Sequence, residues 1–80
     1  MAKKPMSKAQ RRKRAMAPIV GDKFVREENE LTLNVVSETA VTYTHVNRIE
    51  QETNTHTVER VNYLTMIKGA LKNGCTFTPA

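Results

Sequence analysis

The sequence predicts an α+β fold: a small antiparallel β-meander of three to five strands, one C-terminal helix and a disordered basic N-terminal arm. Three observations indicate this fold. Apolar and polar residues alternate along two neighbouring stretches, residues 31–37 and 41–49. Apolar residues then recur at helical spacing within residues 61–74. Seven of the thirteen Lys and Arg residues lie in residues 3–14, which contain no acidic residue.

The arm covers residues 1–20. Its high charge and low apolar content cannot offset the conformational entropy lost on folding, so we expect it to be disordered when free. Ser7 can cap a short helix from Lys8 to Met16 on contact with a partner, and Pro18 would end that helix. So short a helix is unstable in water by itself.

The body covers residues 21–80 and starts at the chain break Gly21-Asp22. Residues 23–26 are a short strand candidate, and residues 27–30 are a polar turn rich in Glu. A body of about sixty residues buries only roughly 60% of the surface that its unfolded chain exposes, so its stability is marginal.

Residues 31–37 are the strongest strand prediction. Alternation places Leu31, Leu33 and Val35 on one face. Val36 breaks the alternation, so either the second face is partly covered or a β-bulge lies there.

A second alternating run, residues 41–49, joins the first through a turn at residues 37–40 and forms an antiparallel hairpin with it. Residues 55–59 are rich in threonine and are predicted to form an edge strand.

The helix is predicted over residues 61–74. Asn62 is its candidate N-cap, Val61 and Met66 can form a hydrophobic staple, and Asn73-Gly74 supplies the C-terminal cap. Its apolar face, consisting of Leu64, Ile67 and Leu71, should pack on the sheet face of Leu31, Leu33 and Val35.

A final short strand is predicted at residues 75–78. With five short strands the sheet could curl into an SH3-like half-barrel. An open sheet covered by one helix fits the pattern equally well.

Enzymatic and metal sites are not expected. Cys75 is the only cysteine, and it follows a helix C-terminus, where the dipole raises the pKa of a thiol. His45 and His56 are the only histidines, and a metal site needs three or four ligands. The chain also lacks a Gly-rich phosphate loop, so we expect neither a cofactor nor catalysis.

The membrane is also not an expected partner. No segment approaches the ~20 apolar residues needed to span a bilayer. The basic N-terminus has no apolar core after it, unlike a secretory signal. We therefore expect a cytoplasmic protein, which would mean the host cytoplasm if the protein is viral, with Cys75 as a reduced thiol.

The arm carries the strongest functional signal. Basic side chains that meet phosphates release condensed counterions, which favours binding to the backbone of DNA or RNA. No aromatic residue interrupts the arm, so base stacking is not expected from it. The predicted nucleic-acid-binding residues are Lys3, Lys4, Lys8, Arg11, Arg12, Lys13 and Arg14.

The body has the opposite charge. It contains six basic and eight acidic residues, which is a net charge of −2. Its acidic turns at residues 27–30 and 50–52 are most simply solvated, but an acidic surface could also dock a basic protein.

The order Gly21-Asp22-Lys23-Phe24, then residues 31–36, then Val41-Thr42-Tyr43, then a polar strand and a helix resembles small bacteriophage-encoded proteins. The resemblance covers roughly residues 21–74. It implies an accessory or regulatory protein that acts on host transcription, replication or defence, and it transfers no functional residue.

These observations predict a non-enzymatic, nucleic-acid-associated regulatory protein, and the resemblance implies that it is phage-encoded. In this hypothesis the arm contacts phosphates and the body docks a partner. The alternative is a protein-interaction module that inhibits or redirects a host enzyme such as RNA polymerase or a nuclease.

Overall fold

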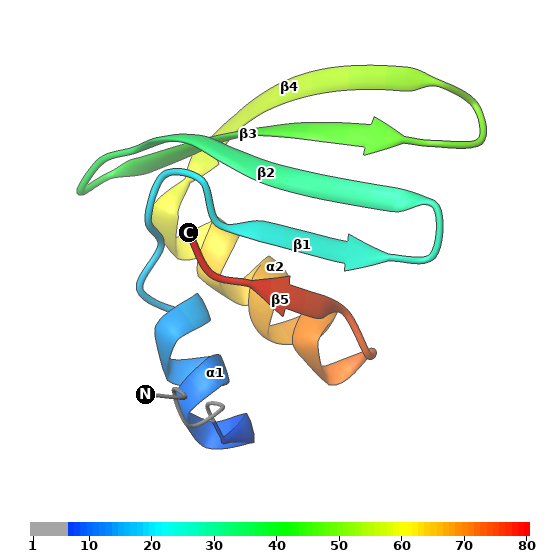
Figure 1. Ribbon diagram of the computed structural model, residues 1–80. Coiled ribbons are helices and arrows are strands. Elements are labelled where there is room, and N and C mark those ends of the chain that lie inside the picture. Colours follow the sequence, from blue (N-terminus) through cyan, green and yellow to red (C-terminus); the bar gives the residue numbers. More distant parts are fainter. Residues whose placement is uncertain (1–6) are drawn as a thin grey trace.

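The computed structural model describes residues 7–80 and shows a five-stranded antiparallel sheet with α2 against one face and α1 beside α2 (Figure 1). The elements are α1 (Lys8–Ala15), β1 (Lys23–Arg26), β2 (Asn29–Val36), β3 (Ala40–Asn47), β4 (Glu52–Glu59), α2 (Arg60–Lys72) and β5 (Thr76–Thr78). The strand order is β4-β3-β2-β1-β5, so β4 and β5 are the edges. The predicted meander with a C-terminal helix is confirmed, and the sheet is open rather than a half-barrel.

Short polar turns join the first four strands. Glu27 and Gln51 adopt φ of 54° and 56°, in the left-handed region that few non-glycine residues occupy. The first turn is shorter than predicted, because β2 begins at Asn29, which pairs with Arg26. Similarly, β4 begins at Glu52, three residues before the predicted start.

A β-bulge interrupts β2 beside Asn34. Leu33 pairs with Tyr43, but Val35 pairs with Thr42, so the register shifts between Leu33 and Val35. The extra residue reverses the alternation: Val35 is 57% exposed, whereas Val36 packs against the core. The bulge was one of the two alternatives that the sequence left open. The placement of Val35 on the core face with Leu33 was wrong.

The core lies between the sheet and α2. Its buried side chains are Ala15, Phe24, Leu33, Val41, Tyr63, Ile67 and Phe77. Leu31, Leu64 and Leu71 pack against it and are partly buried, so the predicted contact between the helix face and the strand is confirmed apart from Val35. Tyr63 is completely buried. The sequence pattern had predicted it only to flank the apolar face of Leu64, Ile67 and Leu71.

The start of α2 differs from the prediction. The N-cap is Glu59, whose side chain makes no capping hydrogen bond, and Asn62 lies inside the helix. The Arg60 N–H is instead bonded to the Thr39 carbonyl oxygen at 2.8 Å, so the β2–β3 turn supplies a partner for the helix start. Val61 is 64% exposed and forms no staple. At the other end, Gly74 adopts φ +90° and ends the helix as predicted.

The predicted disorder of the arm is wrong over residues 7–20. Lys8–Ala15 form α1 within the free chain, capped by Ser7, whose side chain accepts from the Gln10 N–H at 3.2 Å. Ala15 is fully buried in the core of the body. The partner that stabilises this short helix is therefore the body itself. Residues 1–6 lie outside the described residues.

No helix within residues 7–80 combines the length and the apolar composition that crossing a bilayer requires.

Candidate nucleic-acid interface

The predicted phosphate-binding residues do not share one environment. Lys8, Arg11 and Arg12 follow the i, i+3, i+4 spacing of one helix face, and Ala15 continues that face into the core. Lys13 is exposed and does not line the groove described below. Lys3 and Lys4 lie outside the described residues.

Arg14 is held by the body. Its guanidinium donates two hydrogen bonds of 2.8 Å to the carboxylate of Asp22, which is fully buried. The carboxylate also accepts from the backbone N–H groups of Ile19 at 3.0 Å and Ala80 at 2.9 Å. Burial alone would raise the pKa of Asp22, but the hydrogen bonds from Arg14, Ala80 and Ile19 outweigh it and lower the pKa. Arg14 therefore orients α1 on the body, and we assign it a structural role.

Arg11 has a divided role. Its Nη1 donates to the carbonyl oxygen of Phe77 on β5 at 3.3 Å. A guanidinium has five N–H donors, so this bond leaves others free for a ligand. Arg11 thus both ties α1 to the edge of the sheet and lines the adjacent groove.

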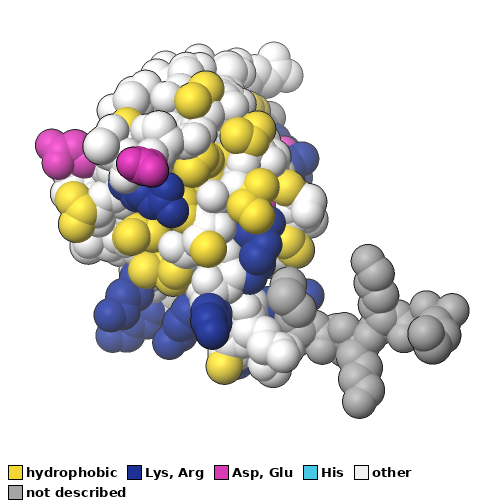
Figure 2. Space-filling model, turned by 90° about the vertical axis from the view of Figure 1, so that its left-hand side faces the viewer, with side chains coloured by type: hydrophobic (Ala, Val, Ile, Leu, Met, Phe, Trp, Pro, Cys, Tyr) yellow, Lys and Arg dark blue, Asp and Glu magenta, His cyan; other side chains and the backbone are white. Residues whose placement is uncertain are grey.

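A groove of about 690 Å³ lies between α1, the last turn of α2 and β5. It is lined by Lys8, Arg11, Arg12, Leu71, Lys72, Gly74, Cys75, Thr76 and Phe77. Its charged lining residues are all basic, and no acidic residue of the described part of the chain lines it. Figure 2 shows Lys and Arg side chains gathered at the lower end of one face, where α1 lies.

Lys72 is the member of this groove that the sequence did not connect with the arm. It lies in the last turn of α2, where a basic residue also suits the helix dipole. The only local signal was its basic charge near a helix end. The contact between α1 and α2 could not be inferred from either segment alone.

The groove suits phosphate better than bases. One face of the Phe77 ring stacks on Phe24 with centroids 4.9 Å apart, and the Arg14 guanidinium lies 5.7 Å from the ring centroid. Phe77 is also only 3% exposed, so it offers no free face for a base. The cations around it are the groups available to a ligand.

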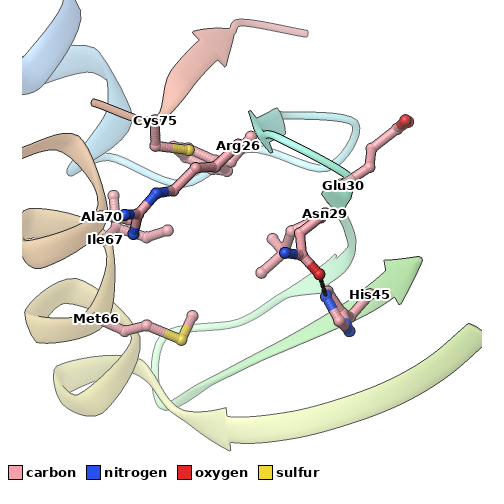
Figure 3. Close-up of a pocket in the computed structure, with 10 residues that line it drawn as sticks. Arg26, Asn29, Glu30, His45, Met66, Ile67, Ala70 and Cys75 are labelled. Carbon is pink, nitrogen blue, oxygen red and sulfur yellow. Dashed lines mark hydrogen bonds between the residues drawn. The ribbon is translucent and has the colours of Figure 1, made fainter. Parts of the chain in front are cut away.

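A second cavity, of about 130 Å³, lies between α2 and strands β1, β2 and β3, and Cys75 lines both this cavity and the groove. Figure 3 shows Met66 pointing into it from α2, and His45 hydrogen-bonded to Asn29 on the far side. The His45 Nε2 to Asn29 Oδ1 distance is 2.9 Å. The cavity is mostly apolar and too small for a nucleotide, so we do not assign it to the interface.

The remaining chemistry-bearing side chains are dispersed. His56 lies opposite Tyr43, with ring centroids 5.5 Å apart, and His45 lies opposite Asn54. Residues 7–80 contain no group of three His, Cys, Asp or Glu side chains placed to hold a metal. Burial raises the pKa of the Cys75 thiol, which disfavours the reactive thiolate.

Comparisons of the chain with protein-family models, curated proteins and solved structures gave no match. The resemblance to phage-encoded proteins stays a prediction, and the functional argument rests on the groove.

Proposed function

We propose that the protein binds nucleic acid through its phosphate backbone, and that the groove between α1 and α2 is the contact surface. The observation that carries this proposal is the convergence of Lys8, Arg11, Arg12 and Lys72 from two helices on one groove. Each cation that meets a phosphate releases condensed counterions, which favours binding.

In this proposal the protein is a non-enzymatic regulatory or accessory factor. Because α1 is folded and docked before binding, little conformational entropy is lost when the groove meets a phosphate chain. The absence of a free aromatic face in the groove means that the affinity depends weakly on base sequence. DNA and RNA strands are then both ligands.

The test is a titration of labelled DNA and RNA oligonucleotides, single-stranded and duplex, at increasing salt. The double variant Arg12→Ala/Lys72→Ala removes one Arg and one Lys from the groove. Its affinity should fall, and the slope of log K against log salt should become shallower by about one for each lost phosphate contact.

The matched control is Lys23→Ala/Arg48→Ala, which removes the same charge from outside the groove. Lys23 forms a partly exposed ion pair with Glu30, and Arg48 lies in the β3–β4 turn. This control should bind like the unaltered protein. Equal losses in the two double variants would show that net charge, rather than the groove, determines binding.

A second candidate function is docking of a basic protein, such as a host polymerase or nuclease. The acidic turns Glu27-Glu28 and Glu50-Gln51-Glu52 lie at the same end of the sheet, beside Ile49, which is 77% exposed. This function would be favoured if the unaltered protein bound no oligonucleotide at low salt but bound such an enzyme, and if Ile49→Asp abolished that binding.

A further inference from the structure

The outer edge of β4 is the longest open edge of the sheet. Among the described residues β4 pairs only with β3 and lies at the edge of the sheet (Figure 1). All its residues except Val58 are exposed. The strand contains no Pro, Lys or Arg, the residues that commonly protect an edge from pairing. The opposite edge, β5, has only three residues and is followed by Pro79.

The pairing of β4 with β3 determines which backbone groups are free. The Arg60 N–H is bonded to the Thr39 carbonyl oxygen, one step beyond the pair of Ala40 and Glu59. Hydrogen-bonded and non-hydrogen-bonded pairs alternate in an antiparallel ladder. Counting back from Arg60, the even-numbered residues of β4 bond to β3, and Thr53, Thr55, Thr57 and Glu59 direct their N–H and C=O groups outward.

We propose that β4 pairs antiparallel with β4 of a second copy of the chain, about a two-fold axis at Thr55. Three of the four outward-facing residues are threonines placed symmetrically around Thr55, and the fourth, Glu59, lies at the end of the strand. In this register Thr55 meets Thr55 of the second copy, and Thr53 meets Thr57. The two sheets then form one continuous sheet with a closed, symmetric interface.

The side chains are compatible with this register. Threonine already pairs with threonine between β3 and β4, where Thr42 Oγ1 and Thr57 Oγ1 are 2.9 Å apart and Thr44 Oγ1 and Thr55 Oγ1 are 3.3 Å apart. The same kind of pair recurs across the new interface.

Other pairs in this register avoid charge conflict. Asn54 lies opposite His56, and Glu52 lies opposite Val58, so no acidic residue of the strand faces another. A two-fold axis at His56 would pair Thr53 with Glu59 rather than with another threonine. An axis at Asn54 would pair only residues 52–56 of the strand.

This inference concerns the edge opposite α1 and does not depend on nucleic-acid binding. The mass of the nuclease-treated full chain is measured in high salt over a range of concentrations by sedimentation equilibrium. The mass should rise with concentration from 9.1 kDa to twice that value. A mass of 9.1 kDa at every concentration into the millimolar range would overturn the proposal.

Thr55→Pro tests the interface. The N–H that this substitution removes points away from β3, so the internal ladder is retained. The variant should stay monomeric at concentrations where the unaltered protein and the side-chain control Thr55→Val are dimeric. Circular dichroism checks that it is folded. A folded Thr55→Pro variant that dimerises like the unaltered protein would place the interface elsewhere.

Cysteine cross-linking tests the register without requiring Pro to be tolerated. Across a hydrogen-bonded pair the Cα atoms are about 5.5 Å apart, within the range of about 4.4–6.8 Å that a disulfide spans. In a Cys75→Ser background, Thr55→Cys should form a covalent dimer with oxidised glutathione. In the control Thr57→Cys, the new cysteine faces Thr53 of the second copy, so this variant should not form a covalent dimer. Equal cross-linking of the two variants, or cross-linking of Thr57→Cys alone, would overturn this register.

Discussion

At the scale of single residues, Asp22 connects three parts of the chain. Its carboxylate accepts hydrogen bonds from Arg14 of α1, from Ile19 in the loop before β1 and from Ala80 at the end of the chain. It is fully buried, so the charge depends on these partners. From the sequence, Asp22 was only part of a chain break.

The stability of the protein should therefore depend on the ionisation of Asp22. Its pKa is lower in the folded chain than the value of about 3.9 typical of unfolded Asp. The stabilisation is fully present above the unfolded pKa and is lost as the pH falls through the folded pKa.

Asp22→Asn should lower the free energy of unfolding at pH 7 by about 3 kcal/mol or more, because it leaves Arg14 without its charged partner. Urea unfolding is measured between pH 7 and pH 2. The free energies of unfolding of the variant and the unaltered protein should become more similar as the pH falls. Arg14→Lys, which keeps the charge but loses the two-pronged contact, serves as the comparison. A difference that is constant across this range would contradict the assigned role of Asp22.

Tyr63 presents the reverse case, a buried polar atom without a partner. Its hydroxyl has no hydrogen-bond partner among the described groups, and burial raises its pKa. An unsatisfied buried hydroxyl costs about 1–3 kcal/mol. Tyr63→Phe should thus leave the free energy of unfolding unchanged or increase it, whereas Tyr63→Ala should lower it by about 3–5 kcal/mol. Chemical denaturation measures both. A marked loss in Tyr63→Phe would show that the hydroxyl is satisfied.

At the scale of the elements, the bulge in β2 decides which aliphatic side chains stabilise the sheet. Leu33 and Ile67 are each 1% exposed, while Val35 is 57% exposed. Leu33→Ala and Ile67→Ala should each lower the free energy of unfolding by about 2–5 kcal/mol. Val35→Ala should change it by no more than about 0.5 kcal/mol. Thermal melting distinguishes these outcomes. A large loss in Val35→Ala would mean that β2 continues its alternation without a bulge.

The short helix α1 shows how local and long-range effects combine. Ser7 and Gln10 form a complete capping box, and Arg12, Lys13 and Arg14 lie at the favourable end of the helix dipole. Eight residues are still too few for a stable isolated helix. Packing of Ala15 and the Arg14–Asp22 pair supply the remaining stabilisation.

At the scale of the whole molecule, charges of opposite sign are separated. The basic groove lies between α1, the end of α2 and β5, whereas the acidic residues lie in the turns that join β1 to β2 and β3 to β4 (Figure 1). If the proposed function holds, this arrangement would orient the molecule as it approaches a polyanion, because the groove would be attracted and the acidic turns repelled.

The two proposed surfaces use opposite edges of the sheet. The groove includes β5, and the proposed dimer interface is β4. A dimer would therefore carry two grooves on one continuous sheet. Two linked sites on the same strand of nucleic acid bind more tightly than either alone when both can be engaged together.

The sequence by itself determined the elements that depend on neighbouring residues. Alternation located β2 and β3, the apolar spacing located α2, and Ser7 and Gly74 marked one end of each helix. These signals act over a few residues, so they remain readable without knowledge of the fold.

Only the tertiary structure decided where the described part of the arm lies. Arg14 and Asp22 are eight residues apart, Asp22 and Ala80 are 58 apart, and Arg11 and Phe77 are 66 apart. No local pattern specifies such contacts, because they form only when the sheet and α2 create a surface for α1. Because α1 docks there, its basic residues line one side of the groove, and Lys72 of α2 lines the same groove.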